Sequence, residues 1–292
     1  MKKMKKLAAL MMTGVLIAAS LCACGKKDSD GKTSKEKKTA KVININLTDE
    51  EYAFGIDKDQ PELLEKTNEF IKKIMDDGTF DKICNNYFGD GEPVAVKSAS
   101  LDTSKDQLVV ATNAAFEPFE YLKGDSYFGV DMEIAKALAD YLGQELVIQN
   151  MDFDAVCLSV GQHKCDIAMA GLTVKPEREA YVTFTNSYYY ASQKLIVLNS
   201  NTEFDNCTDA ASVEAILNTK DSKTKVGFQN GTTGQFYCEG DESWGFAGFK
   251  MSSTGYKNGS LAVQDLLNGN IDFVIIDAAP AEFITKSINA VQ

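Results

Sequence analysis

The sequence is poor in the residues that mark several classes of protein. It has five prolines and one histidine in 292 residues, and it contains no Cys-x-x-Cys pair. Because 44% of its residues are apolar and 25% are charged, a disordered, collagen-like or small disulfide-stapled protein is excluded. Gly-x-Ser-x-Gly, His-Glu-x-x-His, Walker and Gly-x-Gly-x-x-Gly motifs are also missing, so the sequence shows no catalytic or nucleotide-binding pattern.

A net positive charge is found only at the beginning of the chain. The formal net charge is −12, yet residues 1–23 hold four lysines and no acidic residue, and residues 25–41 hold seven lysines and three acidic residues. Residues 42–292 therefore carry a net charge of about −20. A surface of that sign repels phosphate backbones, so nucleic-acid binding is not expected.

Residues 1–23 have the pattern of an export signal. Four lysines precede an apolar run from Leu7 to Leu21, which is shorter than the ~20 residues that a membrane span needs. The following Leu21-Cys22-Ala23-Cys24-Gly25 resembles the lipobox of bacterial lipoproteins. The resemblance implies cleavage before Cys24 and lipidation of its thiol, and the alternative is an uncleaved signal anchor.

Residues 24–41 are expected to form a lipid-anchored flexible linker. The segment after Cys24 is made mostly of Lys, Ser, Asp, Gly and Thr and has no large apolar residue up to Lys41. Its positive charge suits contact with anionic lipid headgroups, or serves only to keep the linker soluble.

The cysteines and the single histidine give no sign of a metal or cofactor. Once Cys22 and Cys24 are set aside, an odd number of cysteines is left, which argues against a full disulfide framework and leaves a pair between Cys207 and Cys238 open. His163 lies in a polar stretch and is interpreted as a surface turn residue. The remaining cysteines are Cys84, Cys157, Cys165, Cys207 and Cys238.

Strand and helix patterns alternate along the chain, which predicts parallel α/β sheets with binding crevices at the carboxyl ends of the strands. Ser260 is expected to cap one helix, and Pro280 suits the first turn of another that ends near Ser287. Helices are predicted at Pro61–Met75, over a short segment with Phe80 to Phe88, and at Asp131–Leu142. Strands are predicted at Leu108–Val110, Leu146–Ile148, Asp166–Met169, Lys194–Leu198, Lys225–Phe228 and Asp272–Ile276.

A series of segments resembles the polar amino-acid-binding proteins of ABC importers. Their order and spacing together make the resemblance specific. The segments are Ala111–Tyr121, Gly129–Glu133, Met151–Asp154, Asp166–Thr173, Pro176–Arg178, Phe184–Tyr189, Val226–Gly234 and Val274–Asp277. The resemblance implies an α/β fold of two lobes, of the type II periplasmic-binding-protein kind, joined by two hinge strands.

One part of the chain departs from the family order. Residues 53–89 resemble the family's closing segment but come first, so the chain is expected to be circularly permuted. Residues 90–107 are the expected connector between the old ends. Gln292 then stands where a member of the family would continue into the segment that here begins at Val42. Lobe 1 is then 53–191, and lobe 2 is 192–292 plus 42–50, with an edge strand such as Val42–Leu47. The alternative is that Val42–Gly89 forms an unrelated amphipathic domain.

The resemblance also implies a charge clamp for an amino acid. Arg178 matches the residue that holds the α-carboxylate, and Asp277, with the Gly171 carbonyl, matches the ammonium acceptor. The alternatives are an Arg178 paired with a neighbouring glutamate and an Asp277 that only caps a helix. In the family pattern, Thr173 serves both ligand charges, and Thr232 and Thr233 add backbone N–H donors. Phe116 and Phe153 match the aromatic walls of the pocket. The expected site residues are Asn113, Phe116, Phe153, Gly171, Leu172, Thr173, Arg178, Gln229, Thr232, Thr233 and Asp277.

Two amides decide the expected ligand type. Asn113 and Gln229 are neutral, so a neutral polar ligand such as glutamine is favoured, while the nearby Glu117 and Asp154 keep a basic ligand as the alternative.

The expected protein is therefore a monomeric, lipid-anchored receptor outside the cytoplasm that passes an amino acid to an ABC permease. Two other functions remain open, a dehydratase-type enzyme on the same fold and a sensory module. The sequence does not specify the amino acid, the permease or the type of cell envelope.

Overall fold

The computed structural model describes residues 37–292. The expected signal peptide (1–23), the expected lipidation site Cys24 and most of the expected linker (24–41) lie outside these residues. In the described part of the chain, no helix combines the length and the apolar character needed to cross a membrane.

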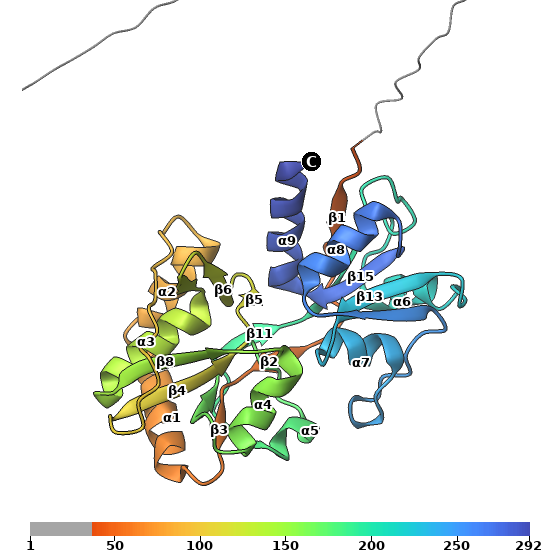
Figure 1. Cartoon of the computed structure of the whole chain (residues 1–292). Helices are drawn as coiled ribbons and strands as arrows, with labels where there is room; N and C mark the ends of the chain where they lie inside the picture. The colour runs from red at the N-terminus through yellow and green to blue at the C-terminus, as the bar shows by residue number, and fades with distance from the viewer. Residues whose placement is uncertain (1–36) are drawn as a thin grey trace, which may run out of the picture. The chain divides into compact units, whose positions relative to one another are not determined.

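Two five-stranded sheets form the centres of two lobes (Figure 1). The sheet of lobe 1 has the order β10 (Val182–Phe184), β3 (Gly55–Asp57), β9 (Ile167–Ala168), β4 (Gln107–Thr112) and β8 (Glu145–Asn150). The sheet of lobe 2 has the order β1 (Ala40–Ile43), β12 (Gln193–Leu198), β15 (Phe273–Asp277), β13 (Lys225–Gln229) and β14 (Ser252–Tyr256). We use lobe 1 and lobe 2 for the sheets and the elements packed on them.

A two-stranded antiparallel ribbon joins the lobes. It consists of β2 (Glu50–Tyr52) and β11 (Tyr189–Ala191), in which Tyr189 pairs with Tyr52 and Ala191 with Glu50. The chain enters lobe 1 through β2 and returns to lobe 2 through β11. These two crossings form the hinge of the molecule.

Helices cover the sheets, and a small three-stranded sheet completes lobe 1. Lobe 1 has α1 (Pro61–Asp76), α2 (Thr79–Phe88), α3 (Val130–Leu142), α4 (Phe153–Gly161), α5 (Pro176–Glu179), β5 (Ala115–Phe116), β6 (Glu120–Lys123) and β7 (Ser126–Phe128). Lobe 2 has α6 (Ala210–Leu217), α7 (Thr233–Glu239), the 3-10 turn η1 (Glu242–Trp244), α8 (Gly259–Asn268) and α9 (Ala278–Val291). The predicted helices at 61–75 and 131–142 are confirmed, and the latter ends at Gly143 with φ 75°.

Several details differ from the sequence predictions. The sheets are mixed rather than parallel, because β3 and β12 enter directly from the hinge ribbon and run antiparallel to β9 and β15. The edge strand is Ala40–Ile43 rather than Val42–Leu47. Asn258, not Ser260, caps α8, because its side chain accepts a 3.0 Å hydrogen bond from the N–H of Leu261. The last helix continues past Ser287 to Val291.

The beginning of β1 lies beside the end of α9. The side chain of Asn289 donates to the carbonyl of Ala40 at 2.8 Å and accepts from its N–H at 3.0 Å. One amide side chain thus holds together two segments from opposite ends of the described chain.

Candidate functional site

The expected site residues lie at the carboxyl ends of strands or directly after them. This placement follows from the fold, because the parallel strands of each sheet, β4, β8 and β9 in lobe 1 and β13 and β15 in lobe 2, end at the edge that faces the other lobe. Asn113 follows β4, Phe116 ends β5, Phe153 opens α4, Gly171, Leu172 and Thr173 follow β9, Arg178 lies in α5, Gln229 ends β13, Thr232 and Thr233 begin α7, and Asp277 ends β15.

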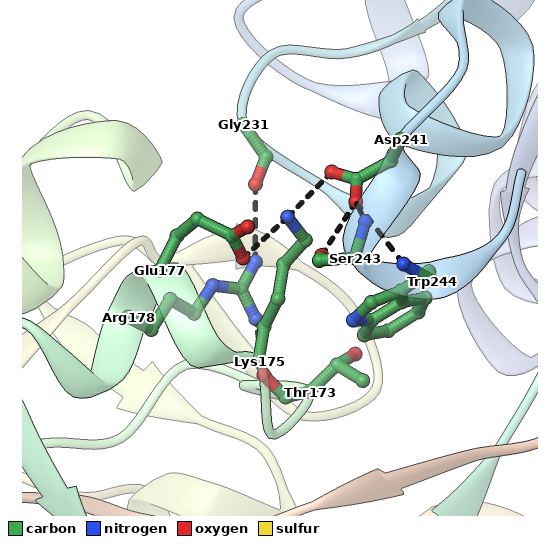
Figure 2. A network of polar contacts seen from close by, with 8 residues as sticks. All are labelled: Thr173, Lys175, Glu177, Arg178, Gly231, Asp241, Ser243 and Trp244. Carbon is green, nitrogen blue, oxygen red and sulfur yellow. Dashed lines mark hydrogen bonds and ion pairs between the residues drawn. The ribbon is translucent and has the colours of Figure 1, made fainter.

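Arg178 connects the two lobes. Its Nη1 donates to the carbonyl of Thr173 at 2.6 Å, and its Nη2 donates to the carbonyl of Gly231 in lobe 2 at 3.0 Å (Figure 2). Its guanidinium carbon lies 5.2 Å from the centre of the Phe153 ring. The remaining N–H donors of the guanidinium are left for an anion.

Arg178 is also the only arginine in the sequence, whereas every other strongly basic residue is a lysine. A guanidinium offers a planar fork of donors that an ammonium group cannot reproduce. The presence of the one arginine at the contact between the lobes indicates a role that lysine cannot fill. The motifs identified Arg178 without the use of this signal.

The two amides of the expected ligand pocket bond to each other across the lobes. Gln229 Nε2 donates to Asn113 Oδ1 at 3.2 Å, and Asn113 Nδ2 donates to the carbonyl of Met151 at 2.7 Å. Gln229 Oε1 is buried without a partner among the described residues. The spare hydrogen-bonding group of this pair is therefore an acceptor.

Asp277 is buried and occupies the N-cap position of α9, but its side chain does not cap the helix. Instead, Oδ1 accepts a 2.5 Å hydrogen bond from the hydroxyl of Tyr52 in the hinge. Burial, followed by the nearby charge of Glu50, raises the pKa of Asp277 to about 7. This carboxyl group is held at the junction of the lobes by a hydroxyl and not by a cationic side chain.

Glu50 is a member of the site that the sequence reasoning missed. Its Oε2 accepts from the hydroxyl of Thr173 at 2.8 Å, and its Oε1 accepts from the Thr48 hydroxyl at 2.5 Å and from Gln193 Nε2 at 3.0 Å. The sequence reasoning placed residue 50 only at a lobe boundary. No local pattern marks Glu50, because its partners Thr173 and Gln193 lie 123 and 143 positions away in the sequence.

Gly171 is fixed by backbone conformation and by close contact. Its φ is +54°, and a Cβ atom there would lie 2.9 Å from Cε1 of Phe116. Its N–H donates to Asp131 Oδ2 at 2.9 Å, while Asp131 Oδ1 accepts from the hydroxyl of Tyr188 at 2.6 Å. Burial raises the pKa of Asp131 to about 7.

Glu120 is buried with no hydrogen-bond partner for either carboxylate oxygen among residues 37–292. Burial, then the charges of Asp131 and Asp277, raise its pKa well above the ordinary value. Glu50, Glu120, Asp131 and Asp277 are thus carboxyl groups close enough to influence one another's pKa.

Thr233, Thr232 and Leu172 are also expected site residues, and each makes hydrogen bonds within the protein. Thr233 donates through its hydroxyl to the hydroxyl of Thr173 at 3.3 Å, which is another contact between the lobes. Thr232 donates from its hydroxyl to the Gln229 carbonyl at 2.8 Å, and its N–H has a long 3.5 Å contact to the same carbonyl. Leu172 is buried, and its carbonyl accepts from the N–H of Ala53 at 3.0 Å.

His163 lies in the turn after α4, away from these residues. Its Nδ1 is 2.7 Å from Asp57 Oδ2, and its Nε2 is 3.7 Å from Asp59 Oδ2. The hydrogen bond with Asp57 raises the pKa of the imidazole. These three residues are the one group within the described chain that has the composition and spacing for a metal ion, and the five cysteines there are free thiols.

Comparisons with known proteins identify the family and the fold. The sequence model of the bacterial extracellular solute-binding proteins, family 3, matches residues 108–273. The arginine-binding extracellular protein ArtP of Bacillus subtilis is 31% identical over 196 residues, covering 67% of this chain and 70% of ArtP. The chain spans 65 to 70% of the length of the first relatives that it matches.

Two solved structures share the fold. An ancestral amino acid-binding protein, described as a precursor of cyclohexadienyl dehydratase, has 28% identity and a TM-score of 0.53, with 63% of this chain and 75% of that chain covered. An ancestral arginine-binding protein bound to glutamine has 29% identity and a TM-score of 0.51, with 63% and 74% covered. The fold is therefore the two-lobed type II fold of periplasmic binding proteins, and the chain belongs to the bacterial extracellular solute-binding proteins, family 3.

Proposed function

We propose that this protein captures an amino acid between its two lobes and delivers it to the permease of an ABC importer. The observation that carries the proposal is that Arg178 in lobe 1 and Asp277 in lobe 2 are each held by neutral groups, two backbone carbonyls and one tyrosine hydroxyl, within the described residues. A buried zwitterion needs a partner for each charge, because an unpaired buried ion costs several kcal/mol. The names of the relatives, which are binding proteins of transporters, support this assignment.

The roles follow from the contacts of each group. The free donors of Arg178 would hold the α-carboxylate, and Asp277 would accept the α-ammonium with the Gly171 carbonyl. The hydroxyl of Thr173, now shared by Glu50 and Thr233, would turn toward the ligand. Phe116 and Phe153 would pack on the side chain, where aromatic faces also suit cations.

The neutral amides favour a neutral polar ligand such as glutamine. Gln229 Oε1 is an acceptor without a partner, and the side-chain amide of glutamine supplies an N–H donor for it. The solved ancestral relative with bound glutamine supports this ligand class.

A basic ligand is the second candidate. The carboxyl groups of Glu50 and Asp277 offer acceptors at the junction of the lobes, and a bound cation would favour their ionised forms. The arginine-binding relatives support this alternative. A guanidinium would use the same spare acceptor of Gln229.

Competition binding separates the two ligand classes. The protein, unfolded and refolded to remove copurified ligand, is loaded with radiolabelled glutamine and challenged with each amino acid at equal concentration. We expect unlabelled glutamine to displace the label best. If arginine or lysine displaces it at lower concentration, the neutral-ligand proposal fails while the receptor assignment stands.

We also propose that the protein acts as a binding protein and not as an enzyme of the dehydratase type. The clamp assigns Asp277 to the ammonium, and Glu120, another acid that could serve in catalysis, is buried with neither carboxyl oxygen hydrogen-bonded among residues 37–292. Mass spectrometry of the amino acid recovered after long incubation tests this, since an enzyme would return a changed compound.

The proposed domain division is lobe 1 at 53–191 and lobe 2 at 192–292 plus 42–50, in a circularly permuted chain. Three observations support it. The family match begins only at residue 108, yet β3 lies within the lobe 1 sheet and β1 lies at the edge of the lobe 2 sheet. The contact between Asn289 and Ala40 brings the end of α9 to the start of β1.

A rearranged gene tests the permutation. Residues 40–89 are moved behind Gln292 through a short Gly-Ser linker, and the chain then begins at Asp90, so that the connector with the buried Val96 stays in place. We expect the rearranged protein to unfold cooperatively and to bind the same amino acid within about threefold of the original affinity, because the contacts of both lobes are kept. A chain that fails to fold in this order would contradict the permutation.

The relatives are extracellular or periplasmic proteins, which supports a location outside the cytoplasm. We propose that Cys24 carries the lipid that attaches the protein to the cell membrane. The apolar run before Cys24 and the lipobox-like residues around it support this anchor.

A further inference from the structure

Lys175 is buried at a position where its sequence context gives it no local role. It is the N-cap residue of α5, where Ser, Thr, Asn or Asp would accept a backbone hydrogen bond, and its side chain makes no capping bond. Only 3% of its side chain is exposed. A buried lysine at a cap position indicates that another contact compensates for this placement.

The compensating contacts come largely from the other lobe. The ammonium of Lys175 is 2.6 Å from Asp241 Oδ2 in lobe 2 (Figure 2). It also lies 4.1 Å from the centre of the Phe236 ring, in the same lobe. Its second carboxylate partner, Glu177 at 2.6 Å, belongs to its own lobe. If the lobes separated, Lys175 would keep Glu177 and lose Asp241 and Phe236.

Asp241 is held in place by its own loop. Its Oδ1 accepts from the N–H of Ser243 at 2.9 Å, from the N–H of Trp244 at 3.3 Å and from the Ser243 hydroxyl at 2.5 Å (Figure 2). Burial raises the pKa of Asp241, but the hydrogen bonds from Lys175 and Ser243 outweigh it and bring the pKa below its ordinary value. The carboxylate is thus ionised and already oriented toward lobe 1.

This ion pair differs from the surface pairs of the protein. Lys97 and Asp125 are 2.6 Å apart, yet 61% and 91% of their side chains are exposed. Exposed pairs of that kind contribute little and are screened by salt. The pair of Lys175 and Asp241, with exposed fractions of 3% and 13%, is screened much less.

We propose that Lys175 and Asp241 form a latch between the lobes that stabilises their closed arrangement and slows the release of bound ligand. Neither residue belongs to the clamp of Arg178 and Asp277, so both are positioning residues. A stabilised closed arrangement raises the fraction of binding-competent protein and lengthens ligand residence, since release requires the lobes to open. The effect on ligand release rests on the proposed function.

The kinetic test uses the fluorescence of Trp244, the single tryptophan of the sequence, which lies in η1 beside the latch. Stopped-flow mixing with L-glutamine and L-arginine gives association and dissociation rates. We expect Lys175→Met and Asp241→Asn each to increase the dissociation rate about tenfold and to change the association rate less than about twofold. The double variant should release ligand no faster than about twice the single variants, because both remove the same interaction.

Asp241→Asn keeps the oxygen that Ser243 and Trp244 bond to, so it removes the charge with little effect on the loop. Lys97→Met is the matched control and should leave both rates unchanged. A dissociation rate of Asp241→Asn within twofold of the wild type would overturn the latch.

A second measurement is independent of the ligand. By small-angle X-ray scattering without ligand, Lys175→Met and Asp241→Asn should have a larger radius of gyration than the wild type and the Lys97→Met control. Equal radii would contradict the latch. If the wild type bound none of the twenty amino acids, the proposed function would fail, and the scattering comparison would still decide whether the latch exists.

Discussion

The hydroxyl of Tyr52 donates a 2.5 Å hydrogen bond to Oδ1 of Asp277, a residue 225 positions further along the chain. Tyr52 ends the hinge strand β2, and Asp277 ends β15 in lobe 2. The contact links the hinge to the proposed ammonium acceptor. The orientation of that carboxylate therefore depends on a residue that comes from the segment outside the family match.

Replacement of Tyr52 by Phe should weaken both stability and ligand binding. The buried Asp277 would lose its hydroxyl donor, which costs about 1–3 kcal/mol in unfolding free energy. Urea unfolding and calorimetry measure the two effects. Tyr190→Phe is the control, because its side chain is 82% exposed on the other hinge strand. Equal unfolding free energies for Tyr52→Phe and wild type would contradict the importance of this contact.

Substitution of Arg178 or Asp277 by Ala should abolish amino-acid binding, because each leaves a ligand charge buried and unpaired, at a cost of roughly 3 to 5 kcal/mol. Arg178→Lys should restore little, since an ammonium cannot form the bidentate fork. Calorimetry on folded variants gives the result. Near-wild-type affinity in either Ala variant would show that the replaced residue does not bind the ligand charge.

Chemical modification offers an independent test of the same residue. Phenylglyoxal reacts selectively with arginine side chains, and Arg178 is the only arginine in the chain. Modification of one site should remove binding, and saturating amino acid should slow the reaction. Rapid modification in the presence of bound ligand would show that the guanidinium is not covered by it.

Stability of the ligand-free protein should fall as the pH rises from about 5 to 7.5. Burial raises the pKa values of Asp131 and Asp277 to about 7, so the folded protein holds protons that the unfolded chain, with ordinary carboxyl groups, has already lost. The raised pKa of His163 acts in the same direction. Thermal melts across this range measure the effect, and Asp277→Asn should reduce the slope. A wild-type melting temperature that rises across the same range would show that these groups are ionised in the folded protein.

Replacement of Cys24 by Ser should release the protein from the membrane fraction. Lipidation needs the thiol, and no helix in the described residues can cross a membrane. Fractionation of cells that express each form gives the answer. A Ser variant that is processed normally and still sediments with membranes would contradict the lipid anchor.

Local patterns in the sequence were sufficient to predict most helices. The apolar spacing in 61–75 and the glycine after Leu142 define their elements without reference to the rest of the chain. Sheet direction was not predictable in this way. Strands β3 and β12 look like any buried strand, and their antiparallel pairing follows from their connection to the hinge.

The resemblance to the family predicted the charged and aromatic residues of the site, but it did not predict which residues contact them. Glu50 and Asp241 become visible only when the lobes are placed together, because their contacts with Thr173 and Lys175 join segments far apart in sequence. Buried groups such as Glu120 look like exposed acids in the sequence. Their raised pKa values arise from packing, which no local pattern encodes.

The most direct test of the central claim is a thermal-shift screen of the full-length protein against the twenty amino acids after copurified ligand has been removed by unfolding and refolding. A ligand at 100 times its dissociation constant adds about 2.7 kcal/mol to the unfolding free energy, which raises the melting temperature by several degrees. We predict such a shift with at least one polar amino acid, and its loss in Arg178→Ala. A refolded protein with native circular dichroism that none of the twenty amino acids stabilises would contradict the account.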